Sequence, residues 1–75
     1  MQGLRNKREL AELSQIALAS RAEVSRMRLQ LAEAGVLTLR PDEIDAIGRV
    51  LRDSLQRRAA ALQSALLNTF EQAKG

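Results

Sequence analysis

Residues 14–35 constrain the fold of this chain more than any other stretch. They carry two serines, Ser14 and Ser25, each followed by apolar residues at helical spacing. Serine is a favoured N-cap, because its hydroxyl accepts a backbone N–H of the first helical turn. Gly35 suits the left-handed position that ends a helix. We therefore expect two short helices joined by a tight turn. The two helices are expected at residues 15–21 and 26–34, and the turn between them at residues 22–24.

The inner faces of these two helices carry six apolar side chains, two of which are small enough to let the helices approach closely. We expect all six to pack inward as a core. They are Leu18, Ala19, Ala22, Val24, Leu29 and Ala32.

Two further helices are expected on either side of this pair. The spacing of leucines and alanines predicts one helix at residues 4–12, and residues 36–40 form an extended connection. Pro41 fits the first position of a last helix that continues to about residue 73. Only Gly48 weakens it, at a cost of about 1 kcal/mol. The predicted helix is about 48 Å long, more than so small a domain can cover.

The composition excludes several classes of function. The chain has 75 residues, no cysteine, no histidine and one aromatic residue. It therefore lacks disulfides, thiolate or imidazole metal ligands and an aromatic platform for single-stranded nucleic acid. We expect no enzyme, no metal and no cofactor. The absence of an apolar run of about 20 residues and of a signal peptide predicts a cytoplasmic protein without membrane contact.

The positive charge is concentrated in the first part of the chain. Up to Arg40 there are seven basic and four acidic residues, whereas five of each follow from Pro41 onward. The whole excess of +3 therefore lies with the two short helices and their surroundings. Attraction to phosphate would require this distribution, although a mildly basic surface without a partner is an alternative explanation.

The pattern of residues 14–35 resembles the helix-turn-helix of the phage repressor and Cro-like family, also called the XRE family. The resemblance covers about residues 4–51, and it departs from the family at Glu23, where glycine is usual. The matching positions are Ser14, Gln15, Leu18, Ala19, Ala22, Val24, Ser25, Arg26, Leu29, Glu33 and Gly35. The resemblance implies an all-α domain of about four helices, here with an extended C-terminal helix.

The resemblance also implies roles for individual residues. The second helix of the motif would enter the major groove of duplex DNA. The residues expected at base edges are Arg26, Met27, Gln30 and Leu31. The residues expected near phosphates are Gln15, Ser25, Arg28 and Arg40. Arg8 and Glu33 would form an ion pair that fixes the angle between the first and third helices.

The chemistry of the base-facing set supports this assignment. Arginine can donate two hydrogen bonds to guanine and glutamine can pair in the same way with adenine. Met27 and Leu31 can pack on a thymine methyl group. The alternative is that Arg26, Arg28 and Gln30 form an ordinary solvated helix face.

The last part of the chain predicts a dimerisation arm. From Leu55 onward the apolar stripe has nothing in its own chain to pack against, and its spacing indicates a short, imperfect two-stranded coiled coil. We expect a DNA-binding domain at residues 1–54 and an arm at residues 55–75. The expected interface consists of Leu55, Ala59, Leu62, Leu66 and Phe70. The competing account is a helix that breaks near Gly48 or Ser54 and folds back.

Together these features predict a sequence-specific double-stranded DNA-binding transcriptional regulator, such as a repressor. It would act as a homodimer on two operator half-sites about 34 Å apart. Two other hypotheses remain open. The chain could be the antitoxin of a toxin–antitoxin module, or an adaptor that has lost DNA binding and pairs with another protein through its C-terminal helix.

Overall fold

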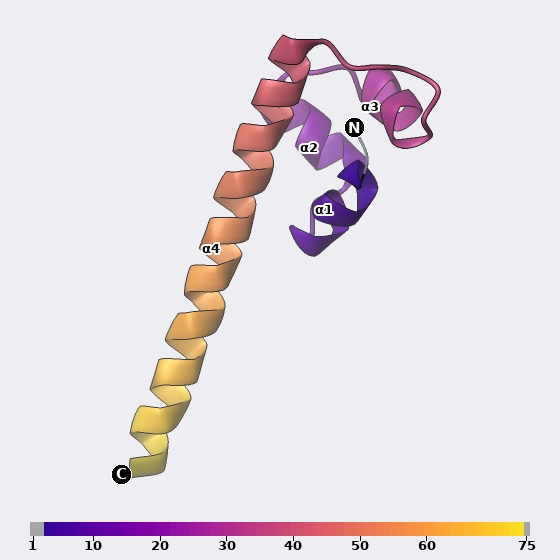
Figure 1. Cartoon of the computed structure of the whole chain (residues 1–75). Coiled ribbons are helices and arrows are strands. Elements are labelled where there is room, and N and C mark those ends of the chain that lie inside the picture. Colours follow the sequence, from indigo (N-terminus) through magenta and orange to yellow (C-terminus); the bar gives the residue numbers. More distant parts are fainter. Residues whose placement is uncertain (1–2, 75) are drawn as a thin grey trace.

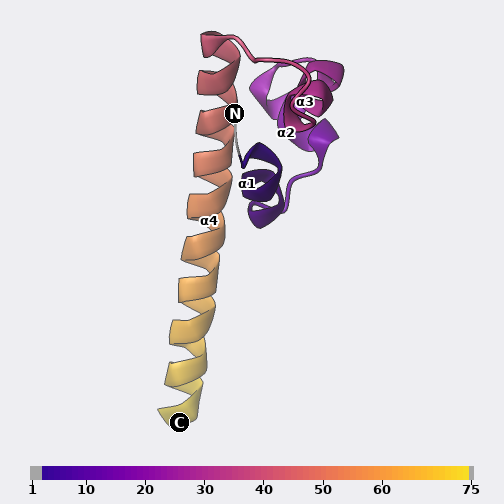
Figure 2. The ribbon, with the colours of Figure 1, turned by 45° about the vertical axis from the view of Figure 1, so that its right-hand side comes forward.

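The computed structural model of the chain describes residues 3–74, with side chains for residues 3–68. This part is all-α and contains four helices. They are α1 (Leu4–Leu10), α2 (Gln15–Ala22), α3 (Arg26–Glu33) and α4 (Pro41–Lys74). The three short helices gather on one side of the N-terminal half of α4, and the second view shows the same arrangement (Figures 1 and 2).

The two predicted serine caps are confirmed. The hydroxyl of Ser14 accepts the backbone N–H of Ala17 at 3.0 Å, and the hydroxyl of Ser25 accepts that of Arg28 at 3.4 Å. Each serine has extended backbone angles, as an N-cap requires. The caps fix where α2 and α3 begin, and so position the turn between them.

The three short helices all end in the same way. The first or second residue after each helix adopts a left-handed conformation, and the next backbone N–H bonds five residues back, which is the Schellman motif. The left-handed residues are Glu12, Glu23 and Gly35. Glu23, which stands where the resembled family usually has glycine, has a φ of 57°. The predicted end of α1 at Glu12 is wrong, because that residue turns left-handed and the helix ends at Leu10.

The core lies where α1, α2 and α3 meet α4. Five of the six apolar residues expected to face inward are buried, and Val24 is partly buried against the same cluster. The side chains with the least exposure are Leu4, Leu18, Leu29 and Ile47. Because one residue from each helix is in this group, the core ties all four helices together.

α4 is one continuous helix of 34 residues. Gly48 does not interrupt it, so the account in which the helix breaks near Gly48 or Ser54 and folds back is wrong. The molecule is consequently elongated, with extents of 54 × 18 × 17 Å, and the C-terminal half of α4 projects beyond the core (Figure 1). Within residues 3–74, no helix combines the length and apolar character needed to cross a membrane.

Candidate functional site

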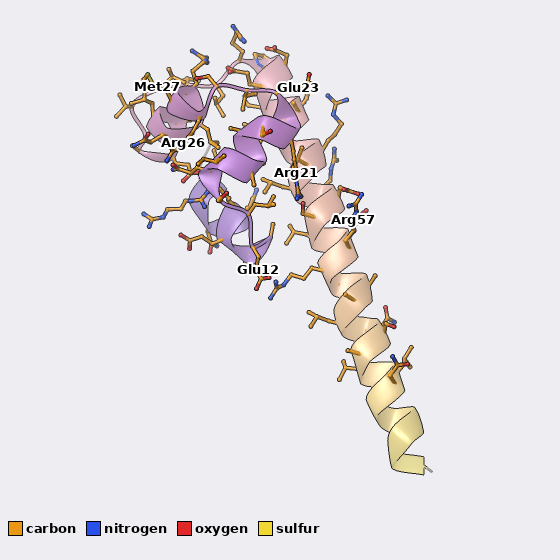
Figure 3. All side chains as sticks on the ribbon, turned by 180° about the vertical axis from the view of Figure 1, so that it is seen from behind. Glu12, Arg21, Glu23, Arg26, Met27 and Arg57 are labelled. Atoms are coloured by element: carbon orange, nitrogen blue, oxygen red, sulfur yellow. The ribbon has the colours of Figure 1, made fainter. Side chains whose placement is uncertain are left out.

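The outward face of α3 carries the residues expected to meet base edges. Leu29 is fully buried, which turns Arg26, Met27 and Gln30 toward solvent, and Met27 is 70% exposed. Figure 3 shows Arg26 and Met27 on α3, away from the projecting part of α4. Leu31 is half-buried instead of fully outward.

The C-terminal end of α3 is held by the ion pair between Arg8 and Glu33. Arg8 donates from Nε and Nη2 to the two carboxylate oxygens at 2.8 and 3.0 Å, and from Nη1 to the carbonyl of Leu13 at 2.9 Å. The amide of Gln15 donates to Glu33 at 3.2 Å. The side chains of Arg8 and Glu33 are 12% and 5% exposed. One carboxylate therefore joins α3 to both α1 and α2.

The charge state of this pair follows from its surroundings. Burial raises the pKa of Glu33, but hydrogen bonds from Arg8 and Gln15 and the charge of Arg8 outweigh burial, so the net pKa is lowered. The hydrogen bond to Glu33 raises the pKa of Arg8 against the opposing effect of its burial. Both groups are consequently charged at neutral pH, and the pair persists.

The N-terminal end of α3 is held by a second pair, Arg28 with Glu43. Arg28 donates from Nε and Nη2 to the two carboxylate oxygens of Glu43 at 2.8 and 2.7 Å. The backbone N–H of Arg40 donates to the same carboxylate at 2.9 Å. These hydrogen bonds lower the pKa of Glu43 to about 2, and its side chain is 3% exposed. The pair therefore anchors α3 to the start of α4.

This second anchor adds a structural role for Arg28. Two of its donor groups bond to Glu43, and the phosphate contact expected for Arg28 stays a prediction. The hydrogen bond from the Arg40 N–H to Glu43 has a local sequence signal, because a Glu three residues after the N-cap position of Arg40 is half of a capping box. The contact of Arg28 with Glu43 has no such signal, since Arg28 lies fifteen residues earlier in the chain and only the fold brings it to Glu43.

The other expected phosphate contacts surround the same face. Gln15 is half-buried at the start of α2, and Ser25 is exposed at the start of α3. Arg40 is 65% exposed and its Nε lies 3.4 Å from Asp42 and 3.6 Å from Glu43. Because exposed ion pairs of this kind are weak, Arg40 can exchange its partner for another anion.

The expected dimer interface divides into two parts. Leu55 is partly buried against the core, and Arg58 pairs with Glu12 of the turn after α1. Contacts between α4 and the globular part therefore continue as far as Arg58. Further along, Ala59 is exposed, and Leu62 and Leu66 are 57% and 61% exposed. Phe70 lies outside the residues whose side chains the structure describes.

Comparisons with protein-family models, with curated proteins and with solved structures found no match for this chain. Across the described residues, no group of three or more Asp and Glu side chains is placed to hold a metal ion. The inference about function therefore depends on the geometry of α3 and its surroundings.

Proposed function

We propose that this protein is a sequence-specific double-stranded DNA-binding regulator whose α3 enters the major groove. The observation that carries the proposal is the anchoring of α3 at both ends. Arg8–Glu33 and Arg28–Glu43 fix the helix against α1 and α4 through two-point hydrogen bonding, while its outer face stays free. A short helix held rigidly with polar side chains outward has the form that groove recognition needs.

The residues on and around that face suit the chemistry of duplex DNA. Arg26 can donate two hydrogen bonds to guanine, Gln30 can pair with adenine, and Met27 can pack on a thymine methyl group. Arg40, Ser25 and the start of α2 at Gln15 would lie near phosphates. The net charge of +3 belongs to the residues up to Arg40, which include this surface. Leu31 and Arg28 have lesser roles, since one is half-buried and the other is paired.

Regulation would follow from occupancy of an operator by a homodimer in the cytoplasm. The projecting part of α4, with its exposed leucines, would join the two copies. The same leucines would also suit a toxin or another regulator, which keeps the antitoxin and adaptor hypotheses as alternatives. An adaptor would show no salt-dependent affinity for duplex DNA. An antitoxin would bind DNA and would also form a stable complex with a different protein.

The experiment compares two arginine variants that remove the same charge. Selection of bound sequences from random duplexes defines the preferred site for the wild-type chain. Arg26→Ala should then weaken binding to that site by about 1–3 kcal/mol and relax the preference at one base position. Arg57→Ala serves as the control, because Arg57 lies on α4 away from α3 and pairs with Asp53 (Figure 3). It should leave the base preference unchanged.

Two results would contradict the proposal. One is a wild-type selection that yields no preferred sequence. The other is an equal loss for Arg26→Ala and Arg57→Ala on specific and random duplexes, which would mean that only total charge matters.

A further inference from the structure

The projecting part of α4 continues the apolar side on which the globular part is packed. Ile47 and Leu51 are buried in the core, and Leu55 is partly buried beside them. Leu62 follows Leu51 by eleven residues, which is about three helical turns, so both side chains leave the helix on nearly the same side. The exposed stripe is therefore an extension of the covered one.

We propose that this stripe is covered by the same segment of a second copy of the chain, running in the opposite direction. This inference rests on the homodimer of the proposed function and adds its geometry. The segment, called the arm below, runs from Ala59 to Lys74 and is about 24 Å long.

The position of the globular part favours the antiparallel direction. It projects from the same side of α4 as the apolar stripe, and its lower edge is marked by the contact of Glu12 with Arg58. Figures 1 and 3 show the arm free below that edge. In a parallel pair, each globular part would occupy the space of the other copy's α4. In an antiparallel pair, most of each arm would lie beneath the other copy's α1, and its last turn would reach the level of Leu55.

The spacing of residues supports the same direction. The heptad has two core positions, called a and d. In an antiparallel coiled coil, an a residue of one helix packs opposite a d residue of the other helix. If Leu62 faces Leu66 of the second copy, the symmetric register also places Ala59 opposite Thr69 and Leu55 opposite Ala73. Each member of these pairs falls on a core position of the heptad, and the remaining exposed surface of Leu55 would be covered.

The distribution of charge along the arm is compatible with this register. No charged residue occurs between Arg58 and Glu71, so the central part of the pair is uncharged.

Sedimentation without DNA tests which side of the arm the second copy covers, with Leu62 and Leu67 as a matched pair of exposed leucines. Leu62 and Leu67 are exposed to 57% and 58%, but Leu67 follows Leu51 by about four and a half turns and so lies on the opposite side. The wild-type chain and Leu67→Glu should sediment at twice the chain mass at tens of micromolar. Leu62→Glu should sediment as a monomer with unchanged helix content. A monomeric wild type, or equal dissociation by both variants, would overturn the proposal.

Disulfide trapping tests the direction, since the chain has no cysteine of its own. Ala59→Cys and Thr69→Cys chains should crosslink efficiently only when mixed, because in the antiparallel register the two copies of residue 59 are about 15 Å apart along the axis. Ser64→Cys, on the outer side of the arm, controls for random collision. Efficient crosslinking of Ala59→Cys with itself would indicate a parallel pair and would overturn the proposal. Both experiments exclude DNA, so their failure would leave groove binding by α3 untouched.

Discussion

Glu43 joins the starts of α3 and α4 through a single carboxylate, which accepts two hydrogen bonds from Arg28 at 2.8 and 2.7 Å. The same carboxylate accepts the backbone N–H of Arg40, just before α4 begins. Because the side chain of Glu43 is 3% exposed, this junction is enclosed within the fold. The orientation of α3 is thus set directly against the helix that carries the arm.

The junction predicts a specific loss of stability in acid. The folded-state pKa of Glu43 is about 2, below its ordinary value of 4.5, because Arg28 and the Arg40 N–H favour the charged form. A lowered pKa stabilises the fold fully above pH 4.5, and this contribution disappears as the pH falls toward 2. Glu33, whose pKa is also lowered, adds to the same loss.

Chemical denaturation at several pH values measures this effect. Glu43→Gln should be less stable than the wild type at pH 6 and should lose less stability between pH 4.5 and 2. Asp45→Asn, which neutralises an exposed carboxylate of the same helix, should follow the wild-type profile. A Glu43→Gln profile parallel to that of the wild type would show that Glu43 does not titrate abnormally.

Removing Arg8 should destabilise the fold far more than removing an exposed arginine of the same helix. Arg8→Ala leaves Glu33 buried with only Gln15 as a donor, and should lower the free energy of unfolding by about 3 kcal/mol. Arg5→Ala breaks the exposed pair with Glu9 and should cost no more than about 0.5 kcal/mol. Denaturant titration of both variants gives the comparison. Equal losses would mean that the Arg8–Glu33 pair has no special structural role.

The left-handed conformation of Glu23 makes it a site for stabilisation. Its φ of 57° costs a residue with a Cβ about 1–2 kcal/mol, and glycine does not incur this cost. Glycine also raises the conformational entropy of the unfolded chain, which offsets part of this gain in stability. Glu23→Gly should therefore raise the free energy of unfolding by about 0.5 kcal/mol. Glu23→Val should lower it, because β-branching disfavours this conformation further. Thermal melts of both variants should therefore shift in opposite directions.

The antiparallel arm predicts the spacing of the two half-sites. In the proposed register the two copies of Glu43 are about 63 Å apart along the axis, close to two turns of B-DNA. Sequences selected from random duplexes should therefore contain two half-sites about 20 base pairs apart. The spacing of about 34 Å expected from the family resemblance would instead favour a parallel arrangement of the arms.

The sequence alone predicted most of the fold because its signals are local. The serine caps, the glycine at the end of α3 and the apolar spacing each act within a few residues, and they located α2, α3 and the start of α4. The sequence predicts that α1 ends at residue 12, two residues too late. Glu12 adopts a left-handed conformation, and glutamate is not a residue type that favours this conformation. The continuity of α4 was left open, since Gly48 weakens a helix without always ending it.

The site was predicted less completely because its anchors are long-range. The pairing of Arg8 with Glu33 followed from the family resemblance, and the structure contains it with two hydrogen bonds. The pairing of Arg28 with Glu43 has no counterpart in any local pattern, so the sequence does not predict it. The exposure of α3 follows from burial of Leu29, whereas binding of DNA by that face is still a prediction.

Binding of duplex DNA by α3 and its surroundings is tested most directly by the salt dependence of the affinity. If the homodimer neutralises about eight phosphates, a plot of log affinity against log salt concentration should have a slope near −7. Fluorescence anisotropy of a labelled duplex between about 50 and 200 mM salt measures this slope. A flat response, or no binding at the lowest salt concentration, would contradict DNA binding and favour the adaptor.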